Sequence, residues 1–236
     1  MRLALLTAFA ASLTLGQTPA PQNVLQRYLQ ASQDHPRAGR EQSMEVEIEA
    51  SLPRLKKHGT MRGLKVITRA GQTIYTRLRF SGDRLVGKHV ISRYLAADVQ
   101  NRLDDPRFAI STKNYRFGPG READYNGRAA QVFRLVPKHR RAGLFRGELW
   151  LDESSALPVR EWGDFVKSPS PFLSHPRFVR DYGLVEDESR PRRLILTARA
   201  AFVGDVQMTI WFGGDARLED ADSSFADEDA VAASNP

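Results

Sequence analysis

The sequence predicts a mainly β protein built on a single, strongly curled antiparallel sheet, with short helices covering its concave face. Apolar and polar residues alternate with a period of two through most of the chain, which is typical of strands with one buried and one solvated face. The connections between these segments are too short for parallel crossovers. A single sheet of about nine or ten twisted strands curls around its apolar face.

The first 16 residues have the layout of a cleaved secretory signal peptide. Arg2 precedes the apolar run 3–15, and Gly16 is a small residue placed for cleavage. This run is shorter than the ~20 residues that span a bilayer, and no later segment is long and uncharged enough to do so. The chain has no cysteine, so we expect neither disulfides nor a lipid anchor. We therefore expect an exported protein in which residues 17–214 form one domain held by its own core.

The basic character of the chain belongs to this predicted domain. The whole sequence has a net charge of +7. From Asp215 to the end, seven acidic residues stand against Arg217, a net charge of −6, so without Arg2 the segment 17–214 carries +12. Such a field favours anionic partners, for example a membrane surface. The acidic segment 215–236 has the composition of a disordered tail.

The N-terminal half predicts a helix, a meander of strands and a second helix. Asn23 is a suitable N-cap for a short helix that stops by Pro36. Strands are then predicted at 44–52, 60–69, 73–80 and 85–91, separated by turn residues. Residues 93–105 return to helical spacing, with Tyr94, Leu95, Val99 and Leu103 on one stripe.

The second half predicts a series of hairpins. Asn126 and Gly127 are a strong turn signal, and residues 108–117 before them fit a strand or an ordered loop. The strands predicted after this turn are 128–136, 144–152, 157–161, 191–203 and 205–212. Phe178, Arg180 and Tyr182 share one face of a further extended segment, and we assign them to the outer face as a cation–π ladder.

The loop predicted at 167–178 combines restricted backbone with apolar side chains. It contains three prolines, which limit its conformations, and Phe172 and Leu173, which need to be buried. One interpretation is an ordered loop packed on the core, as apolar loop residues generally are. The functional interpretation is a rim or lid, including Lys167, at the mouth of the concave face.

The chain lacks the motifs of most catalytic and cofactor sites. Its five histidines are scattered, without a pair at metal-ligand spacing, and it has no Gly-x-Ser-x-Gly elbow. Adjacent Arg and aromatic residues point to opposite faces of a strand, unlike a nucleic-acid platform. We therefore expect no enzyme activity, cofactor, metal or nucleic acid. Less favoured alternatives are a hydrolase with a triad from separate loops and an outer-membrane barrel, whose outward positions must stay uncharged.

Four short stretches carry a family resemblance: 147–152 (GELWLD) with 157–160 (LPVR), and 167–170 (KSPS) with 178–182 (FVRDY). With the order of elements, they resemble the periplasmic lipoprotein-sorting carriers of the LolA type, the outer-membrane lipoprotein-sorting-like proteins, and the related sensor domain of the RseB type. The resemblance covers most of 23–212. It implies a periplasmic protein with an unclosed half-barrel of about 10–11 strands and helices over an apolar cavity that holds acyl chains.

The expected function is therefore a non-enzymatic carrier for the acyl chains of a lipid or lipoprotein. Burying one acyl chain at ~0.8 kcal/mol per methylene contributes on the order of 10 kcal/mol before any cost is subtracted. The expected cavity lining is Met44, Val46, Ile48, Ile74, Leu78, Phe80, Phe133, Leu135, Leu149, Leu151, Leu194, Leu196, Met208, Ile210 and Phe212. The expected rim or lid is Tyr94, Leu95, Val99, Leu103, Lys167, Phe172 and Leu173. The alternative is an envelope sensor that binds a protein partner through the same fold.

Overall fold

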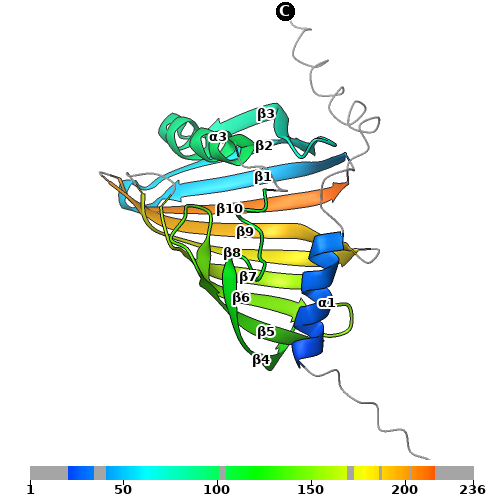
Figure 1. Cartoon of the computed structure of the whole chain (residues 1–236). Helices are drawn as coiled ribbons and strands as arrows, with labels where there is room; N and C mark the ends of the chain where they lie inside the picture. Colours follow the sequence, from blue (N-terminus) through cyan, green and yellow to red (C-terminus); the bar gives the residue numbers. More distant parts are fainter. Residues whose placement is uncertain are drawn as a thin grey trace, which may run out of the picture.

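The described part of the chain folds around one open antiparallel sheet. The computed structural model describes residues 21–34, 41–100, 105–168, 173–185, 188–201 and 203–215, so the predicted signal peptide and nearly all of the predicted acidic tail lie outside it. The sheet has ten strands in the order β3-β2-β1-β10-β9-β8-β7-β6-β5-β4, and Figure 1 shows them side by side. The predicted fold class is confirmed: β3 and β4 are opposite edges, so the sheet does not close.

The elements follow the chain in a simple order. They are α1 (Pro21–Asp34), β1 (Gln42–Leu52), the 3-10 turn η1 (Pro53–Leu55), β2 (Lys57–Ile67), β3 (Thr73–Gly82), α2 (Arg84–Val86), the π-helical turn η2 (Gly87–Ile91), α3 (Ser92–Gln100), β4 (Tyr115–Tyr125), β5 (Arg128–Pro137), β6 (Phe145–Asp152), β7 (Pro158–Phe165), β8 (Leu173–Val185), β9 (Glu188–Ala200) and β10 (Gly204–Asp215). Among the described residues, no helix has both the length and the apolar character that a membrane crossing requires.

Local sequence explains the turns between these strands. Asn126 and Gly127 have φ angles of 55° and 78°, the positive pair that a two-residue type I′ turn requires. At the β6–β7 turn, the Asp152 carboxylate accepts hydrogen bonds from the Ser155 backbone N–H and hydroxyl, both at 2.8 Å, and from the Ser154 hydroxyl at 2.6 Å. This Asp-centred turn sets the register of the hairpin.

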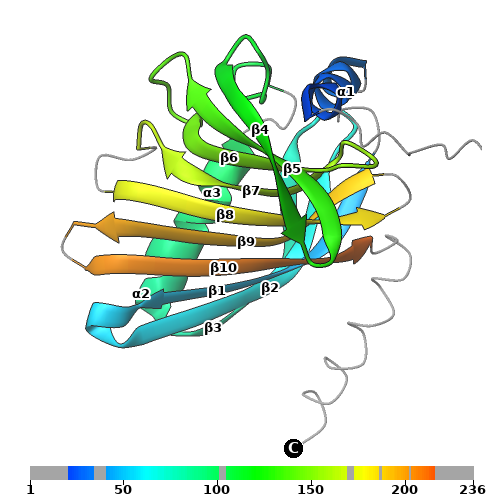
Figure 2. The same cartoon turned by 90° about the horizontal axis from the view of Figure 1, so that it is seen from below.

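The helical segments lie on the concave face of the sheet. The segment α2–η2–α3 connects β3 to β4, which are the two edges of the sheet. Figure 2 shows the curved sheet with α3 on one side of it, behind β7 to β10 in that view. Helix α1 contacts β4 and β6, and the core cluster includes Val24 from α1 and Leu95 from α3 together with inward side chains of the sheet.

The predicted strand over 85–91 is wrong: this segment is α2 followed by η2. Asp83 is the N-cap of α2, and its side chain accepts a hydrogen bond from the Leu85 N–H at 2.8 Å. The cap satisfies a backbone donor that would otherwise be unpaired at the start of a helix. Val86 and Ile91 are then fully buried, so tertiary packing outweighs the β propensity of the Val and Ile residues.

The predicted loop 167–178 is also shorter than expected. Strand β8 begins at Leu173, while 169–172 lie outside the described residues. The predicted outer-face position of Phe178, Arg180 and Tyr182 is wrong, because strand pairing decides the face. Phe178 pairs with Leu196 and Arg180 with Leu194, so these residues face the concave side. Alternation shows only that the three share a face, and pairing with β9 decides which face.

Candidate functional site: the concave face

The concave face is a largely apolar surface made by strand register, interrupted on β7 and β8 by the paired Glu161 and Arg180. Ile48 of β1 pairs with Ile210 of β10, and Ile210 pairs with Leu194 of β9. On the other half of the sheet, Leu149 of β6 pairs with Phe133 of β5. Directly paired residues in antiparallel strands project on the same side. Each of these side chains is at most 6% exposed, so the surface is covered in this structure.

Most of the predicted lining residues lie together on this face. Those that are buried are Met44, Val46, Ile48, Phe133, Leu135, Leu149, Leu151, Leu194, Met208 and Ile210. Leu196 and Phe212 are partly buried and pack against the same cluster. Several of the central side chains have no accessible surface at all, and such side chains do not border a space that water could enter. The central part of the face is therefore closed by the chain's own packing.

The three predicted lining residues on β3 are exposed, and one of them, Ile74, is on the outer side. Ile74, Leu78 and Phe80 are exposed to 45%, 39% and 48%. The register of β3 shifts opposite Gly63, and Arg77 in this bulge has a φ angle of 54°. A bulge moves the residues on its two sides onto different faces. Ile74 pairs with Val66 on the outer side, whereas Phe80 pairs with Met61 on the concave side, so regular alternation through 73–80 does not hold.

Glycines shape the part of the face built by the GELWLD segment. Gly147 of β6 pairs with Gly163 of β7, and a Cβ atom at Gly147 would lie 1.8 Å from the Trp162 carbonyl oxygen. The space beside Gly163 is taken by Phe145, whose ring is 4.8 Å from that of Phe178 and nearly perpendicular to it. Such edge-to-face packing stabilises aromatic clusters. The glycines are therefore needed for close strand approach and for aromatic packing.

A polar group lies within this apolar surface. The Arg180 Nη1 donates hydrogen bonds to Glu161 Oε2 at 3.2 Å and to the Tyr182 hydroxyl at 3.4 Å, and its guanidinium lies 5.6 Å from the centre of the Phe178 ring. Burial lowers the pKa of Arg180, but the neighbouring Tyr182, Glu161 and Tyr94 raise it above its ordinary value. The guanidinium therefore stays charged. Glu161 is 4% exposed, while 36% of the Arg180 side chain remains accessible.

Polar contacts also attach α3 to the sheet. Asp98 Oδ2 accepts hydrogen bonds from Lys65 Nζ on β2 and from the Tyr75 hydroxyl on β3, both at 2.8 Å. Burial, then Tyr94 and Asp98, raise the pKa of Tyr75, and burial followed by Asp98 raises the pKa of Tyr94. Both hydroxyls therefore remain protonated and can donate. Since Tyr94 and Asp98 are one turn apart, a single side of α3 makes these contacts.

The predicted rim residues fall into three groups. Tyr94 is partly buried and Leu95 is 7% exposed on the inner side of α3, whereas Val99 is 46% exposed. Lys167 is exposed beyond the end of β7. Leu173 is the first residue of β8, and Leu103 and Phe172 lie outside the described residues.

Sequence reasoning missed the polar residues of the concave face. The sequence predicts Lys65 on a strand with mixed faces and Asp98 on a helix. Nothing in the sequence indicates that these two side chains are in contact. Arg180 carried a usable signal, because it shares a face with Phe178 and follows it by two residues. Only the register with β9 assigns that face to the inside.

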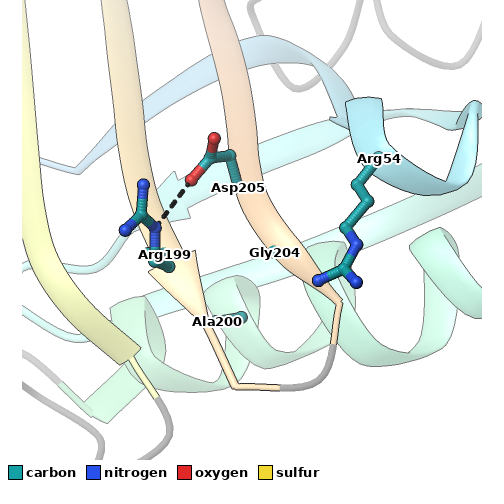
Figure 3. A pocket seen from close by; sticks show the side chains of 5 residues that line it. All are labelled: Arg54, Arg199, Ala200, Gly204 and Asp205. Carbon is teal, nitrogen blue, oxygen red and sulfur yellow. Dashed lines mark hydrogen bonds and ion pairs between the residues drawn. The ribbon is translucent and has the colours of Figure 1, made fainter.

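A separate shallow pocket of about 360 Å³ lies at the β9–β10 turn, where it is lined by Arg54, Arg199, Ala200, Gly204 and Asp205. Figure 3 shows the Arg54 side chain extending toward Gly204, opposite the Arg199–Asp205 pair. Arg199 Nε lies 3.1 Å from Asp205 Oδ1, and both side chains are largely exposed. The pocket belongs to the end of the hairpin, and its lining includes three charged side chains, Arg54, Arg199 and Asp205.

Comparison with known proteins finds similarity in structure but not in sequence. No protein-family model and no curated protein matches the chain. A LolA superfamily protein from Nitrosomonas europaea matches over 84% of this chain and 94% of its own, with 14% identity and a TM-score of 0.46. An outer membrane lipoprotein-sorting protein domain from Vibrio parahaemolyticus matches over 86% and 98%, with 12% identity and a TM-score of 0.41. MucB of Pseudomonas aeruginosa, in its complex with MucA, matches over 86% and 95%, with 10% identity and a TM-score of 0.27. The family resemblance noted from the sequence thus recurs among distant structural matches.

Proposed function

We propose that this protein is an exported, non-enzymatic carrier that holds acyl chains of a lipid or lipoprotein on its concave face. Residues 1–16 would act as the signal peptide and 17–214 as the carrier domain in the periplasm. The observation that carries the proposal is a largely apolar face that extends from β1 to β5 on an open sheet and contains one charged pair, Arg180 and Glu161. The segment α2–η2–α3, which is not part of the sheet, covers this face. Acyl chains need apolar area rather than a precise polar motif.

Because the central face is packed in this structure, a carrier function requires the cover to open before cargo enters. The central side chains are packed, so an acyl chain would have to displace the covering segment α2–η2–α3. That segment contacts β1, β2 and β3, and it is attached through the Lys57–Asp83 ion pair, Asp98 and a few buried apolar residues. Partly buried apolar residues, such as Leu196 and Phe212, extend the surface toward its ends. A covering element with few contacts is the kind that opens most readily.

The proposal is tested by native mass spectrometry of the full chain purified from its own envelope. The expected result is a bound lipid-sized mass that is lost on organic extraction. A stoichiometric protein in place of lipid would instead favour the envelope sensor, and a ligand-free chain would count against both functions.

Two neighbouring residues of β9 provide matched variants. Leu196 faces the concave side, whereas Ile195 pairs with Thr209 on the outer side, and both are partly buried. Leu196→Gln is expected to reduce the retained lipid severalfold, because it places an amide on the apolar surface. Ile195→Gln makes the same chemical change on the other face and is expected to retain the lipid. Equal retention by both variants would contradict binding on the concave face.

A further inference from the structure

We propose that one corner of the sheet is a docking surface for an anionic phospholipid bilayer. We name it the basic corner, and it consists of Leu55, Lys56, Leu78, Phe80, Arg84 and Lys88. These residues come from the β1–β2 connection, the edge strand β3 and the start of α2–η2. They combine exposed apolar side chains with unpaired cations, which is the composition of surfaces that bind at a membrane interface.

Specific contacts bring these three segments together. Lys57 Nζ lies 3.0 Å from Asp83 Oδ2, and the Asp83 N–H donates to the His58 carbonyl at 2.8 Å. Lys56 and Arg84, each adjacent in sequence to one member of the ion pair, are therefore near one another. Phe80 lies against Gly87, where an added Cβ would be 3.6 Å from its ring. Lys88 follows Gly87 directly in the chain.

The apolar members of the basic corner are unusually accessible. Leu55 and Leu78 are each 39% exposed and Phe80 is 48% exposed. Single exposed apolar residues are common and need no explanation. Here two occur on the edge strand β3 and a third on the β1–β2 connection, and an apolar group of this kind indicates an interaction site.

The positive charge of the basic corner is not neutralised within the described part of the chain. Lys56, Arg84 and Lys88 are exposed, and none has an ion-pair partner among the residues that the structure describes. The carboxylate next to Arg84 in sequence, Asp83, is engaged by Lys57, and a hydrogen bond and charge from that lysine lower the Asp83 pKa. Three uncompensated positive charges therefore face solvent beside three apolar side chains, which is complementary to an anionic lipid surface.

The orientation of the basic corner favours a bilayer over an acidic protein. Phe80 pairs with Met61, and Leu78 reaches the concave side of Gly63, so both lie on the concave side of the edge strand β3, the side that the covering segment occupies. Docking there would bring the mouth of the concave face to the lipid. The link between docking and the concave face rests on the proposed carrier function. Binding to lipid vesicles does not, because it can be measured without any cargo.

The test is co-sedimentation of the full chain with vesicles of neutral phosphatidylcholine or of phosphatidylcholine with one-quarter phosphatidylglycerol. Wild type is expected to bind only the anionic vesicles, and less at high salt. The combined variant Lys56→Gln, Arg84→Gln and Lys88→Gln is expected to bind about 100-fold more weakly, because each basic side chain at an anionic surface contributes roughly fivefold. The variant Leu55→Ser with Phe80→Ser is expected to lose binding with its charge unchanged.

The matched control removes three exposed cations at the opposite edge: Lys113→Gln, Arg116→Gln and Arg134→Gln. It has the same net charge as the first variant and is expected to retain most of the vesicle binding. Equal losses in the two triple variants would overturn the assignment to the basic corner and indicate a general charge effect. Absence of wild-type binding to anionic vesicles would overturn it too, and would point to an acidic protein as the partner. Circular dichroism shows whether each variant is folded.

Discussion

At the scale of single residues, buried carboxylates organise arginines on both faces of the sheet. On the outer face, Asp181 is 7% exposed. It accepts hydrogen bonds from Arg193 at 2.7 and 3.1 Å and from the Tyr125 hydroxyl at 2.9 Å, and Arg160 lies 3.6 Å away. One carboxylate thus joins β4, β7, β8 and β9, and charge-assisted hydrogen bonds of this kind are stronger than neutral ones.

Replacing the central carboxylate should cost more than removing one of its partners. We expect Asp181→Ala to lower the free energy of unfolding by about 2 kcal/mol, because it leaves several donors without an acceptor. Arg160→Ala should lower it by about 0.5 kcal/mol, since its ion pair is long and one-third exposed. Urea denaturation of both variants checks this, and equal effects would show that Asp181 is not the centre of the group.

At the scale of elements, α3 depends on a few polar contacts more than on its own sequence. Its nine residues are fewer than an isolated helix needs in water, and Leu95 is its buried apolar residue. Asp98 supplies the connection to β2 and β3 through Lys65 and Tyr75. Only 9% of the Lys65 side chain is exposed, so loss of its partner would leave a buried, unpaired charge.

We therefore expect Asp98→Ala to open α3 while the sheet stays folded. The local cost is about 3 kcal/mol, which corresponds to an increase of roughly 100-fold in amide hydrogen exchange across the helix. Gln100→Ala, an exposed change to a better helix former on the same element, is the control and should leave exchange unchanged or slower. Unchanged exchange in Asp98→Ala would mean that apolar packing alone holds the helix.

At the scale of the whole molecule, shifted pKa values limit stability at both ends of the pH range. Burial alone would raise the pKa of Glu148, but hydrogen bonds from Trp162, Arg121 and Trp150 lower it below its ordinary value. Asp152 behaves similarly, because hydrogen bonds from Ser154 and Ser155 outweigh its desolvation. Burial raises the pKa of Tyr115 to about 12.

The direction of the pH effect follows from these shifts. Carboxyl groups with a lowered folded-state pKa stabilise the protein above their unfolded values, 4.5 for Glu148 and 3.8 for Asp152, and this contribution is lost as pH falls further. A tyrosine with a raised pKa stabilises it below its unfolded value of 10.0, and that contribution is lost as pH rises toward about 12. We expect the urea midpoint to be highest between these limits. Glu148→Gln should weaken the acid dependence and Tyr115→Phe the alkaline dependence, and a Tyr115→Phe variant with the full alkaline loss would contradict the assignment.

The sequence by itself determined the fold class, because a period of two is a local property of each strand. The alternation through 44–52 and the Asn126–Gly127 turn needed no distant contact to be interpreted, and β1 and the β4–β5 hairpin follow from them. The apolar lining on β5, β6, β9 and β10 could be predicted for the same reason, since inward and outward residues alternate within each strand.

Only the tertiary structure decided features that depend on which strands are neighbours. Alternation cannot tell the concave face from the outer one, so the inward position of Arg180 required its pairing with Leu194. The bulge in β3 depends on β2, and the helix at 84–91 depends on the Asp83 cap and on burial of Val86 and Ile91. Local periodicity is set by adjacent residues. The face that a residue occupies, the strand register and the position of the helices over the sheet arise from contacts between residues far apart in the chain.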